Sequence, residues 1–186
     1  MKLSNKKILI LATHGFEQSE LETPRDRLKE AGATVHVVSP EKGEIRGWSL
    51  KDWGRPVKVD HTIDQVSADD YDAIVLPGGQ INPDLLRINA DALKLILAFY
   101  RQNKVVAAVC HAPWLLIETG IIRGRKATSY TSIRTDCVNA GAIWENSAVV
   151  TDEGVITSRN PDDLEAFCAK IIEEVLEGPH KRRMAA

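Results

Sequence analysis

The sequence predicts a doubly wound α/β fold, in which helices cover both faces of a largely parallel β-sheet. Three segments, Ile8–Ala12, Ala73–Leu76 and Val105–Val109, are continuous apolar runs rather than alternating ones. Such runs are typical of strands that are buried on both faces. Segments with helical spacing of apolar residues separate them along the chain. The length of 186 residues predicts one domain, over residues 1–186, with a core of its own.

The first half of the chain adds a helix, a strand and a hairpin to this sheet. Thr23 is a capping residue, Pro24 suits a first helical position, and Gly32 closes the helix. The sequence leaves open whether the helix begins at Pro24 or before it. Thr34–Val38 is the second predicted strand. Glycines separate short apolar pieces within residues 43–59, which predicts a hairpin excursion.

The second half continues the alternation of helices and strands. It is predicted to contain helices at Ala90–Tyr100, Pro113–Glu118 and Asp136–Ala140, a hairpin made of Ala148–Thr151 and Val155–Ser158, a final helix opened by Asn160, and a C-terminal tail over residues 178–186. Strands that alternate with helices in this way favour a parallel sheet.

Charge and hydropathy argue against two classes of partner. Lys and Arg number 24 against 26 Asp and Glu, a net charge of -2, so no basic excess is available to neutralise a nucleic-acid backbone. The basic cluster at residues 181–183 is short. No uncharged stretch can span a bilayer, and Ile8–Ala12 is too short for a signal peptide. We therefore expect a cytoplasmic protein that binds neither nucleic acid nor membrane.

The three cysteines are widely spaced and odd in number. Cys110, Cys137 and Cys168 form neither a disulfide framework nor a metal-binding cluster, so we expect free thiols and no metal. Cys168 falls on the apolar stripe of the final predicted helix and is expected in the core. Cys137 lies in a predicted helix with no assigned partner.

Cys110 occupies the corner between a buried strand and a helix. The residues two before and two after it, Ala108 and Ala112, are small, as the sharp turn of a nucleophile elbow requires. The start of the following helix is expected to lower the pKa of the Cys110 thiol. An inert buried cysteine is the competing interpretation.

Other candidate groups follow the neighbouring strands, where ligands bind in such sheets. The backbone N–H groups of Gly78, Gly79 and His111 could form an oxyanion hole, and the His111 side chain could act as a base. Glu17 and Glu20 follow the first strand and could partner a thiol. Taken singly, the glycines could form an ordinary turn and the carboxylates could be solvated charges.

Together these segments resemble the PfpI/ThiJ family of the class I glutamine-amidotransferase-like superfamily. The resemblance is carried by Gly15–Glu20, Leu76–Gly79, Ala108–Pro113, Arg123–Tyr130, Asn139–Ala142 and Thr157–Leu164. It implies a flavodoxin-like fold. It also implies that Cys110 is the nucleophile, Glu20 the carboxyl that hydrogen-bonds its sulfur, and His111 the adjacent base, with Gly78 and Gly79 as oxyanion donors and Tyr130 near the pocket.

The resemblance further implies a homo-oligomer, a dimer or a hexamer. Asp84 stands where protease-like members place a glutamate that reaches a neighbouring subunit's site, and its side chain is shorter. His14 stands where an acidic or amide residue is commoner, which would put a titratable group at the pocket mouth. Trp48 and Trp53 of the predicted hairpin are candidates for a subunit contact or for the core.

Members of the family are named as cysteine proteases, general stress proteins, glyoxalase III-type enzymes and deglycases. The leading hypothesis is that a Cys110 thiolate attacks a small dicarbonyl such as methylglyoxal, or its adduct on a protein, and that Glu20 or His111 moves the proton that yields lactate. A low pKa of the thiol requires a neutral Glu20. No metal, nucleotide or other cofactor is expected.

Three alternatives stay open, one of them another enzyme and two of them from other functional classes. An intracellular cysteine peptidase would use Cys110 and His111 with an acid from a neighbouring subunit. A redox-sensing or chaperone-like stress protein would oxidise Cys110 without turnover. A flavodoxin-like binding domain without catalysis would leave the elbow unexplained, and the chain has no glycine-rich phosphate loop.

Overall fold

The computed structural model describes residues 2–182 and contains a seven-stranded central sheet. All neighbouring strands in this sheet are parallel except the antiparallel pair β10 and β11. In spatial order the strands are β10 (Val149–Asp152), β11 (Val155–Ser158), β7 (Val105–Val109), β6 (Ala73–Leu76), β1 (Lys7–Leu11), β2 (Thr34–Ser39) and β5 (His61–Thr62). The predicted mostly parallel α/β sheet is confirmed.

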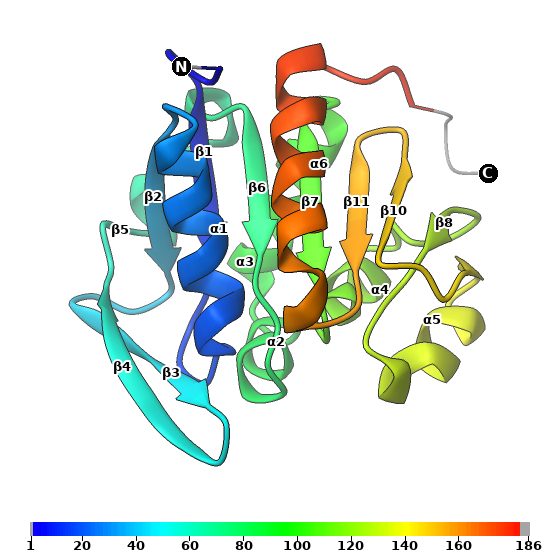
Figure 1. Ribbon diagram of the computed structural model, residues 1–186, viewed down its shortest axis with the longest axis horizontal. Helices are drawn as coiled ribbons and strands as arrows, with labels where there is room; N and C mark the ends of the chain where they lie inside the picture. Colours follow the sequence, from blue (N-terminus) through cyan, green and yellow to red (C-terminus); the bar gives the residue numbers. More distant parts are fainter. Residues whose placement is uncertain (1, 183–186) are drawn as a thin grey trace.

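Helices cover both faces of the sheet (Figure 1). One face carries α1 (Gln18–Glu30) and α6 (Leu164–Glu177), and the other carries α3 (Ala90–Arg101) and α4 (Pro113–Glu118). The remaining helices are α2 (Ile81–Leu86) and α5 (Arg134–Asn139), with 3-10 turns at Ile63–Gln65, Ala68–Asp70, Thr131–Ile133 and Pro161–Asp163. No described helix is long and apolar enough to cross a membrane.

The continuous apolar runs are explained by the two layers of helices. Along β1, Ile8 and Ile10 pack in the core cluster under α1 and α6, whereas Leu9 and Leu11 pack in the cluster under α3. Successive side chains of a strand point to opposite faces, so a strand between two helical layers needs an apolar residue at every position. These central strands bring the segments that follow them to one edge of the sheet.

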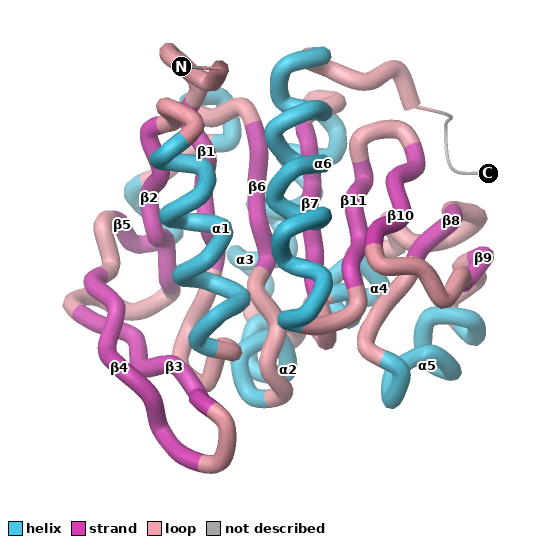
Figure 2. Tube along the Cα trace, viewed as in Figure 1, coloured by secondary structure: helices cyan, strands magenta, loops and turns pink. Residues whose placement is uncertain are grey.

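An antiparallel hairpin occupies the region predicted as an excursion, and it extends below the sheet (Figure 2). It consists of β3 (Glu44–Ser49) and β4 (Asp52–Lys58). A second small sheet pairs β8 (Lys126–Ala127) with β9 (Ile143–Trp144) in parallel. These strands are too short for a sequence pattern to reveal them.

The first helix begins before Pro24. Gln18 is its first residue, Glu17 caps it with extended backbone, and Pro24 lies inside it with a buried ring. The missing N–H of a proline removes one hydrogen bond of the helix, and the packing of the apolar face on the sheet outweighs that loss. The earlier start places Glu20 in the first turn of α1, next to the sheet edge. In the tail, residues 183–186 lie outside the described part of the chain.

Candidate functional site

Cys110 stands at the corner between β7 and α4 in a backbone conformation that is uncommon for a side-chain-bearing residue. Its φ angle is 63°, in the left-handed region that costs energy unless the surroundings impose it. Two backbone hydrogen bonds impose it. The Cys110 N–H donates to the Ser158 carbonyl at 3.0 Å, and the Cys110 carbonyl accepts from the Tyr130 N–H at 2.8 Å. The sulfur is thereby held at the carboxyl-terminal edge of the sheet.

The approach of the β6 loop to this corner requires glycine at position 78. A Cβ atom there would lie 2.5 Å from Glu20 Oε2, 2.7 Å from Cys110 Cβ and 2.7 Å from the Val109 carbonyl. Ala108 and Ala112 on the elbow are fully buried. Small side chains at these positions thus allow three chain segments to meet around one sulfur.

The Gly78 N–H, which we predicted as an oxyanion donor, donates instead to Glu20 Oε2 at 2.9 Å. The N–H groups of Gly79 and His111 act on the Cys110 sulfur and favour its thiolate. The donor set facing the sulfur is therefore made by Gly79 and His111, while Gly78 holds the carboxyl in place. Gly79 has a φ of 81°, and a Cβ atom there would lie 2.6 Å from the Gly15 carbonyl oxygen.

Glu20 is fully buried beside Cys110. Burial raises the pKa of its carboxyl to about 8, although the Cys110 side chain and the nearby N–H groups oppose the rise. The second oxygen, Oε1, is buried without a hydrogen bond of good geometry. A protonated carboxyl with its hydrogen on Oε1 would satisfy that atom, so this environment favours neutral Glu20 at neutral pH.

The pKa of the Cys110 thiol is raised, first by burial and then by the Glu20 carboxyl. This direction is opposite to the one expected from the start of α4. Desolvation of the sulfur and the adjacent carboxylate outweigh the two N–H donors. Protonation of Glu20 removes the negative charge, so the thiolate is favoured when Glu20 is neutral.

The His111 ring turns back to its neighbour. Its Nδ1 lies 3.1 Å from Cys110 Sγ, and its Nε2 lies 3.1 Å from the Ser132 hydroxyl. The ring stacks on Tyr130, with centroids 4.8 Å apart, and its edge meets Trp114. Burial lowers the pKa of His111, so the imidazole is neutral at pH 7 and able to accept a proton. Ser132 was not identified from the sequence, because the 3-10 turn that carries it gives no pattern.

A cavity of about 540 Å³ opens over these groups. Its lining includes the predicted residues Glu17, Glu20, Gly79, Cys110, His111 and Tyr130, together with Gly15, Trp48, Leu50, Gln80, Ile81 and Pro161. Glu17 has a raised pKa because it is partly buried. Trp48, Leu50 and Ile81 were not among the predicted site residues, since only the folded hairpin and α2 bring them to this edge.

Three predicted site residues lie outside the lining: Gly78, which holds Glu20 through its N–H, His14 and Asp84. His14 is tied to the hairpin: its Nδ1 accepts from the Arg46 N–H at 3.0 Å, and its Nε2 lies 3.1 Å from Glu41 Oε2. It therefore positions the wall of the cavity rather than its mouth. Asp84 lies on the exposed side of α2, and its contribution to a neighbouring subunit's site stays a prediction.

The other two cysteines are placed in the cores. Burial raises the pKa of Cys137 to about 11 and that of Cys168 to about 12. Cys137 belongs to the cluster under α3 and α4, and Cys168 is buried on α6. Neither lines the cavity over Cys110, so the three thiols have unequal access to a substrate.

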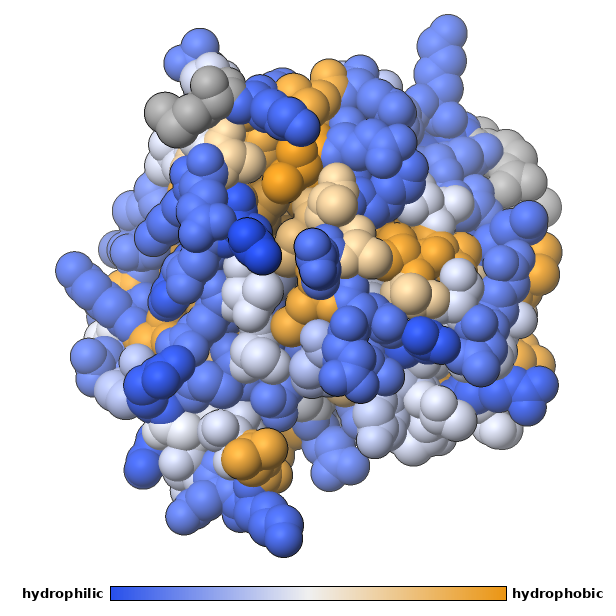
Figure 3. Space-filling view, in the orientation of Figure 1, coloured by the Kyte–Doolittle hydropathy of each residue, from blue (hydrophilic) through white to orange (hydrophobic). Residues whose placement is uncertain are grey.

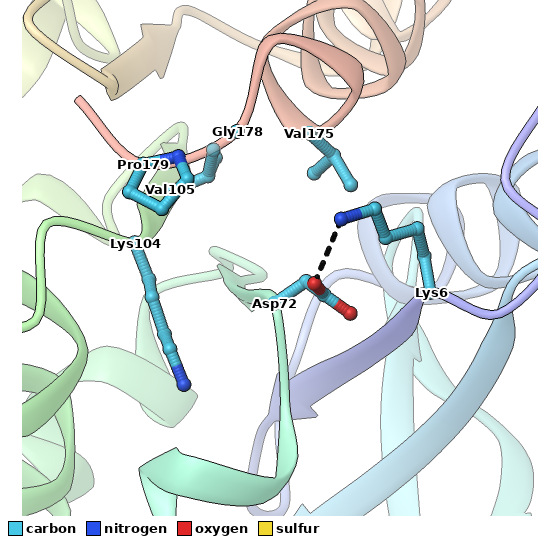
Figure 4. A pocket seen from close by; sticks show the side chains of 7 residues that line it. All are labelled: Lys6, Asp72, Lys104, Val105, Val175, Gly178 and Pro179. Carbon is cyan, nitrogen blue, oxygen red and sulfur yellow. Dashed lines mark hydrogen bonds and ion pairs between the residues drawn. The ribbon is translucent and has the colours of Figure 1, made fainter.

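The opposite edge of the sheet carries a much smaller cavity. A cavity of about 50 Å³ there is lined by Lys6 and Asp72, whose side chains form an ion pair at 3.0 Å (Figure 4). Within residues 2–182, one group has metal-ligating spacing, Glu174, Glu177 and His180 at the end of α6. Glu174 is already paired with Lys170 at 3.1 Å and with His180 at 3.3 Å.

Comparisons with known proteins identify the family of the chain. The sequence model of the DJ-1/PfpI family matches residues 6–174. The chain belongs to the DJ-1/PfpI family. It is 43% identical over 167 residues to Deglycase PfpI of Pyrococcus furiosus, which covers 90% of this chain and 98% of that protein. It is also 43% identical over 164 residues to General stress protein 18 of Bacillus subtilis, with 87% and 93% covered.

The fold of this DJ-1/PfpI chain is shared with solved structures. The crystal structure of Drosophila melanogaster DJ-1beta superposes with a TM-score of 0.83 and 28% identity, over 92% of this chain and 94% of that one. The names of the relatives include deglycases and a general stress protein. The names of deglycases and of Putative cysteine protease YraA of Bacillus subtilis among the relatives support an enzyme of the DJ-1/PfpI family.

Proposed function

We propose that this protein is a deglycase-type enzyme that converts reactive dicarbonyls, or their adducts on proteins, to hydroxy acids through the Cys110 thiolate. The observation that carries the proposal is the contact of Cys110 with a buried carboxyl whose pKa is raised to about 8. A neutral carboxyl beside a cysteine can donate a hydrogen bond to a thiolate and later exchange a proton with a bound intermediate. The names of the deglycase relatives support the same chemistry.

The first step needs a base and a stabiliser for the sulfur. His111 Nδ1, at 3.1 Å from Sγ, accepts the thiol proton. The neutral Glu20 carboxyl and the N–H groups of Gly79 and His111 then hold the thiolate. Burial keeps Glu20 protonated and His111 unprotonated at pH 7, so the ring nitrogen is free to accept and the negative charge that raises the pKa of the Cys110 thiol is removed.

The later steps balance with one water molecule. The thiolate attacks the aldehyde carbon of the dicarbonyl and gives a hemithioacetal. Transfer of the hydrogen from that carbon, as a proton, to the adjacent ketone carbon oxidises the first and reduces the second, and leaves a thioester of a hydroxy acid. Glu20 or His111 carries this proton. Water then cleaves the thioester, so that methylglyoxal and water give lactate, and the thiol is restored.

The charged residues that line the cavity favour an uncharged substrate over an anionic one. Glu17 and Glu20 line it, and no lysine or arginine among residues 2–182 does so. An anionic carbonyl compound would find no compensating cation among the described residues of this lining. Methylglyoxal and its adducts on amines carry no such charge.

Incubation with methylglyoxal and, separately, with unfolded casein tests the proposal. We expect the wild-type protein to form lactate, and we expect Cys110→Ala to reduce lactate formation to background, because the nucleophile is lost. Casein should remain intact in both. Casein cleavage that is lost in Cys110→Ala, without dicarbonyl turnover, would establish the peptidase alternative and overturn the proposal.

The redox alternative makes a different prediction. If Cys110 serves as a sensor, peroxide should oxidise it before Cys137 and Cys168, and the protein should show no dicarbonyl turnover. Intact-mass analysis after a peroxide titration, followed by peptide mapping, measures the order of oxidation. Preferential oxidation together with lactate formation would leave the proposed enzyme function in place.

We also propose that the protein acts as a homo-oligomer, a dimer or a hexamer, in which Asp84 completes a neighbouring subunit's site. Asp84 lies on α2 near two exposed apolar residues, Leu85 at 45% and Ile88 at 83% exposure. Large exposed apolar side chains favour association. Light scattering gives the molar mass, and a mixture of Cys110→Ala and Asp84→Ala subunits should regain activity lost in each alone. A monomer, or full activity of Asp84→Ala, would refute this.

A further inference from the structure

The hairpin is fastened to the loop after β1, and this attachment carries its tip to the cavity. The Gly15 N–H donates to the Arg46 carbonyl at 2.8 Å, and the Trp48 N–H donates to the Phe16 carbonyl at 2.6 Å. The bond between the Arg46 N–H and His14 adds a third tie. These three hydrogen bonds set the position of Trp48 at the side of the site.

The Trp48 ring is held in one orientation. Its indole N–H donates to the Leu50 carbonyl at 3.2 Å, and it meets Trp53 edge to face with ring centroids 5.6 Å apart. Trp48 lines the catalytic cavity, whereas Trp53 lines a separate depression with Gln18 and Arg55. A fixed aromatic side chain at a cavity wall can stack on a flat apolar group at small entropic cost.

Leu50 is an apolar residue that is exposed to solvent and has an unfavourable backbone conformation. It is 92% exposed and has a φ of 57°, a conformation that suits asparagine or glycine better than leucine. Figure 3 shows an apolar patch over the tip of the hairpin among hydrophilic side chains. Leu50 contributes nothing to the buried core, yet it lines the cavity beside Trp48.

We infer that Trp48 and Leu50 form a subsite for an apolar, preferably aromatic, substituent on the substrate. Cys110, Glu20 and His111 are buried and line the same cavity as Trp48 and the exposed Leu50. A ketoaldehyde that places its aldehyde carbon at Cys110 can rest its substituent against them. The inference relies on the proposed dicarbonyl chemistry and narrows its substrate class to aryl-substituted and long-chain 2-ketoaldehydes, in preference to methylglyoxal.

The test compares phenylglyoxal with methylglyoxal as substrates of the full chain. For each variant the measured quantity is the ratio of the two kcat/KM values, which cancels the intrinsic reactivity of the substrates when variants are compared. Trp48→Ala and Leu50→Asn should each lower this ratio by about fivefold, mainly through KM for phenylglyoxal. Leu50→Asn keeps the fold because asparagine adopts positive φ readily.

Trp53→Ala is the matched control, because it removes the same contact between the two indoles but leaves Trp48 at the cavity wall, still held by its indole hydrogen bond to the Leu50 carbonyl. Its ratio should equal that of the wild type. An unchanged ratio in both Trp48→Ala and Leu50→Asn, with turnover still dependent on Cys110, overturns the subsite and leaves the proposed function standing. If turnover does not depend on Cys110, the proposed function fails instead. A change of molar mass in Leu50→Asn without a change of ratio would make Leu50 part of an interface between copies and would also overturn the subsite.

Discussion

At the scale of single residues, the chemistry depends on the protonation states of Glu20 and His111. Below about pH 8 the Glu20 carboxyl keeps its proton and stabilises the thiolate, and above that pH its negative charge opposes it. His111 must be neutral to accept the thiol proton, and burial lowers its pKa. Activity should therefore fall both below and above an optimum pH.

A pH profile of kcat/KM for methylglyoxal tests these assignments. We expect a bell shape, with an alkaline limb near pH 8 from Glu20 and an acid limb below the usual histidine pKa from His111. Glu20→Gln should have lower activity, and its alkaline limb should disappear because glutamine does not ionise. Persistence of the same limb in Glu20→Gln would show that another group titrates there.

The close approach around Gly78 gives a second residue-scale prediction. Gly78→Ala should lower turnover at least about a hundredfold, because the added methyl group collides with Glu20, Cys110 and the Val109 carbonyl. Gly124→Ala is a control for backbone strain alone, since Gly124 has a φ of 70° and open space around a Cβ atom. It should lose about 1 kcal/mol of stability and keep its activity. Equal activities of the two variants would contradict the proposed packing.

The sequence predicted the site residues whose positions depend on local sequence patterns. A nucleophile after an apolar strand, small residues around it and carboxylates after another strand are visible in the chain, and Glu20, Cys110 and His111 do converge. Ser132, Trp48 and Leu50 reach the site through a 3-10 turn and a hairpin whose positions depend on distant hydrogen bonds. The pKa direction of Cys110 was also missed, because it depends on burial that a sequence does not display.

At the scale of elements, strands with uninterrupted apolar runs were the most predictable. The bounds of β6, β7 and α4 match the predicted ranges. Helix α2 was missed because it has six residues and follows a glycine turn directly. The sequence left the start of α1 open because proline prefers the first helical position. The helix begins at Gln18 instead, since its packing against the sheet outweighs the preference of Pro24.

Helix α6 offers an element-scale test of the two-sided packing. Phe167 is fully buried against the sheet, whereas Leu176 on the same helix is 49% exposed. Phe167→Ala should lower the free energy of unfolding by about 3–5 kcal/mol, and Leu176→Ala by less than about 1 kcal/mol. Urea denaturation measures both. Similar losses in the two variants would contradict the assigned buried face of α6.

At the scale of the whole molecule, the buried Glu20 couples stability to pH. In the unfolded chain a glutamate loses its proton near 4.5, whereas native Glu20 retains it up to about pH 8. Between these values the native state binds the extra proton, so raising the pH favours unfolding by up to about 1.4 kcal/mol per pH unit. The stabilising contribution of Glu20 is complete below its pKa in the unfolded chain and is lost as the pH rises through its pKa in the folded protein.

Urea unfolding at pH 5, 6.5 and 8 measures this coupling. Wild type should lose stability across the series, and Glu20→Gln should lose distinctly less because its amide does not titrate. Glu165→Gln, at an exposed position on α6, should behave as the wild type does. A parallel decline in wild type and Glu20→Gln would exclude Glu20 as the source.

The three thiols of the chain allow the most direct test of the whole proposal. Lactate formation from methylglyoxal should be measured for Cys110→Ala, Cys137→Ala and Cys168→Ala under identical conditions. We predict that Cys110→Ala falls to the background rate, while Cys137→Ala and Cys168→Ala, whose sulfurs lie in the cores away from the cavity, retain turnover when folded. Lactate formation at the wild-type rate by Cys110→Ala would contradict the assignment of Cys110 as the nucleophile.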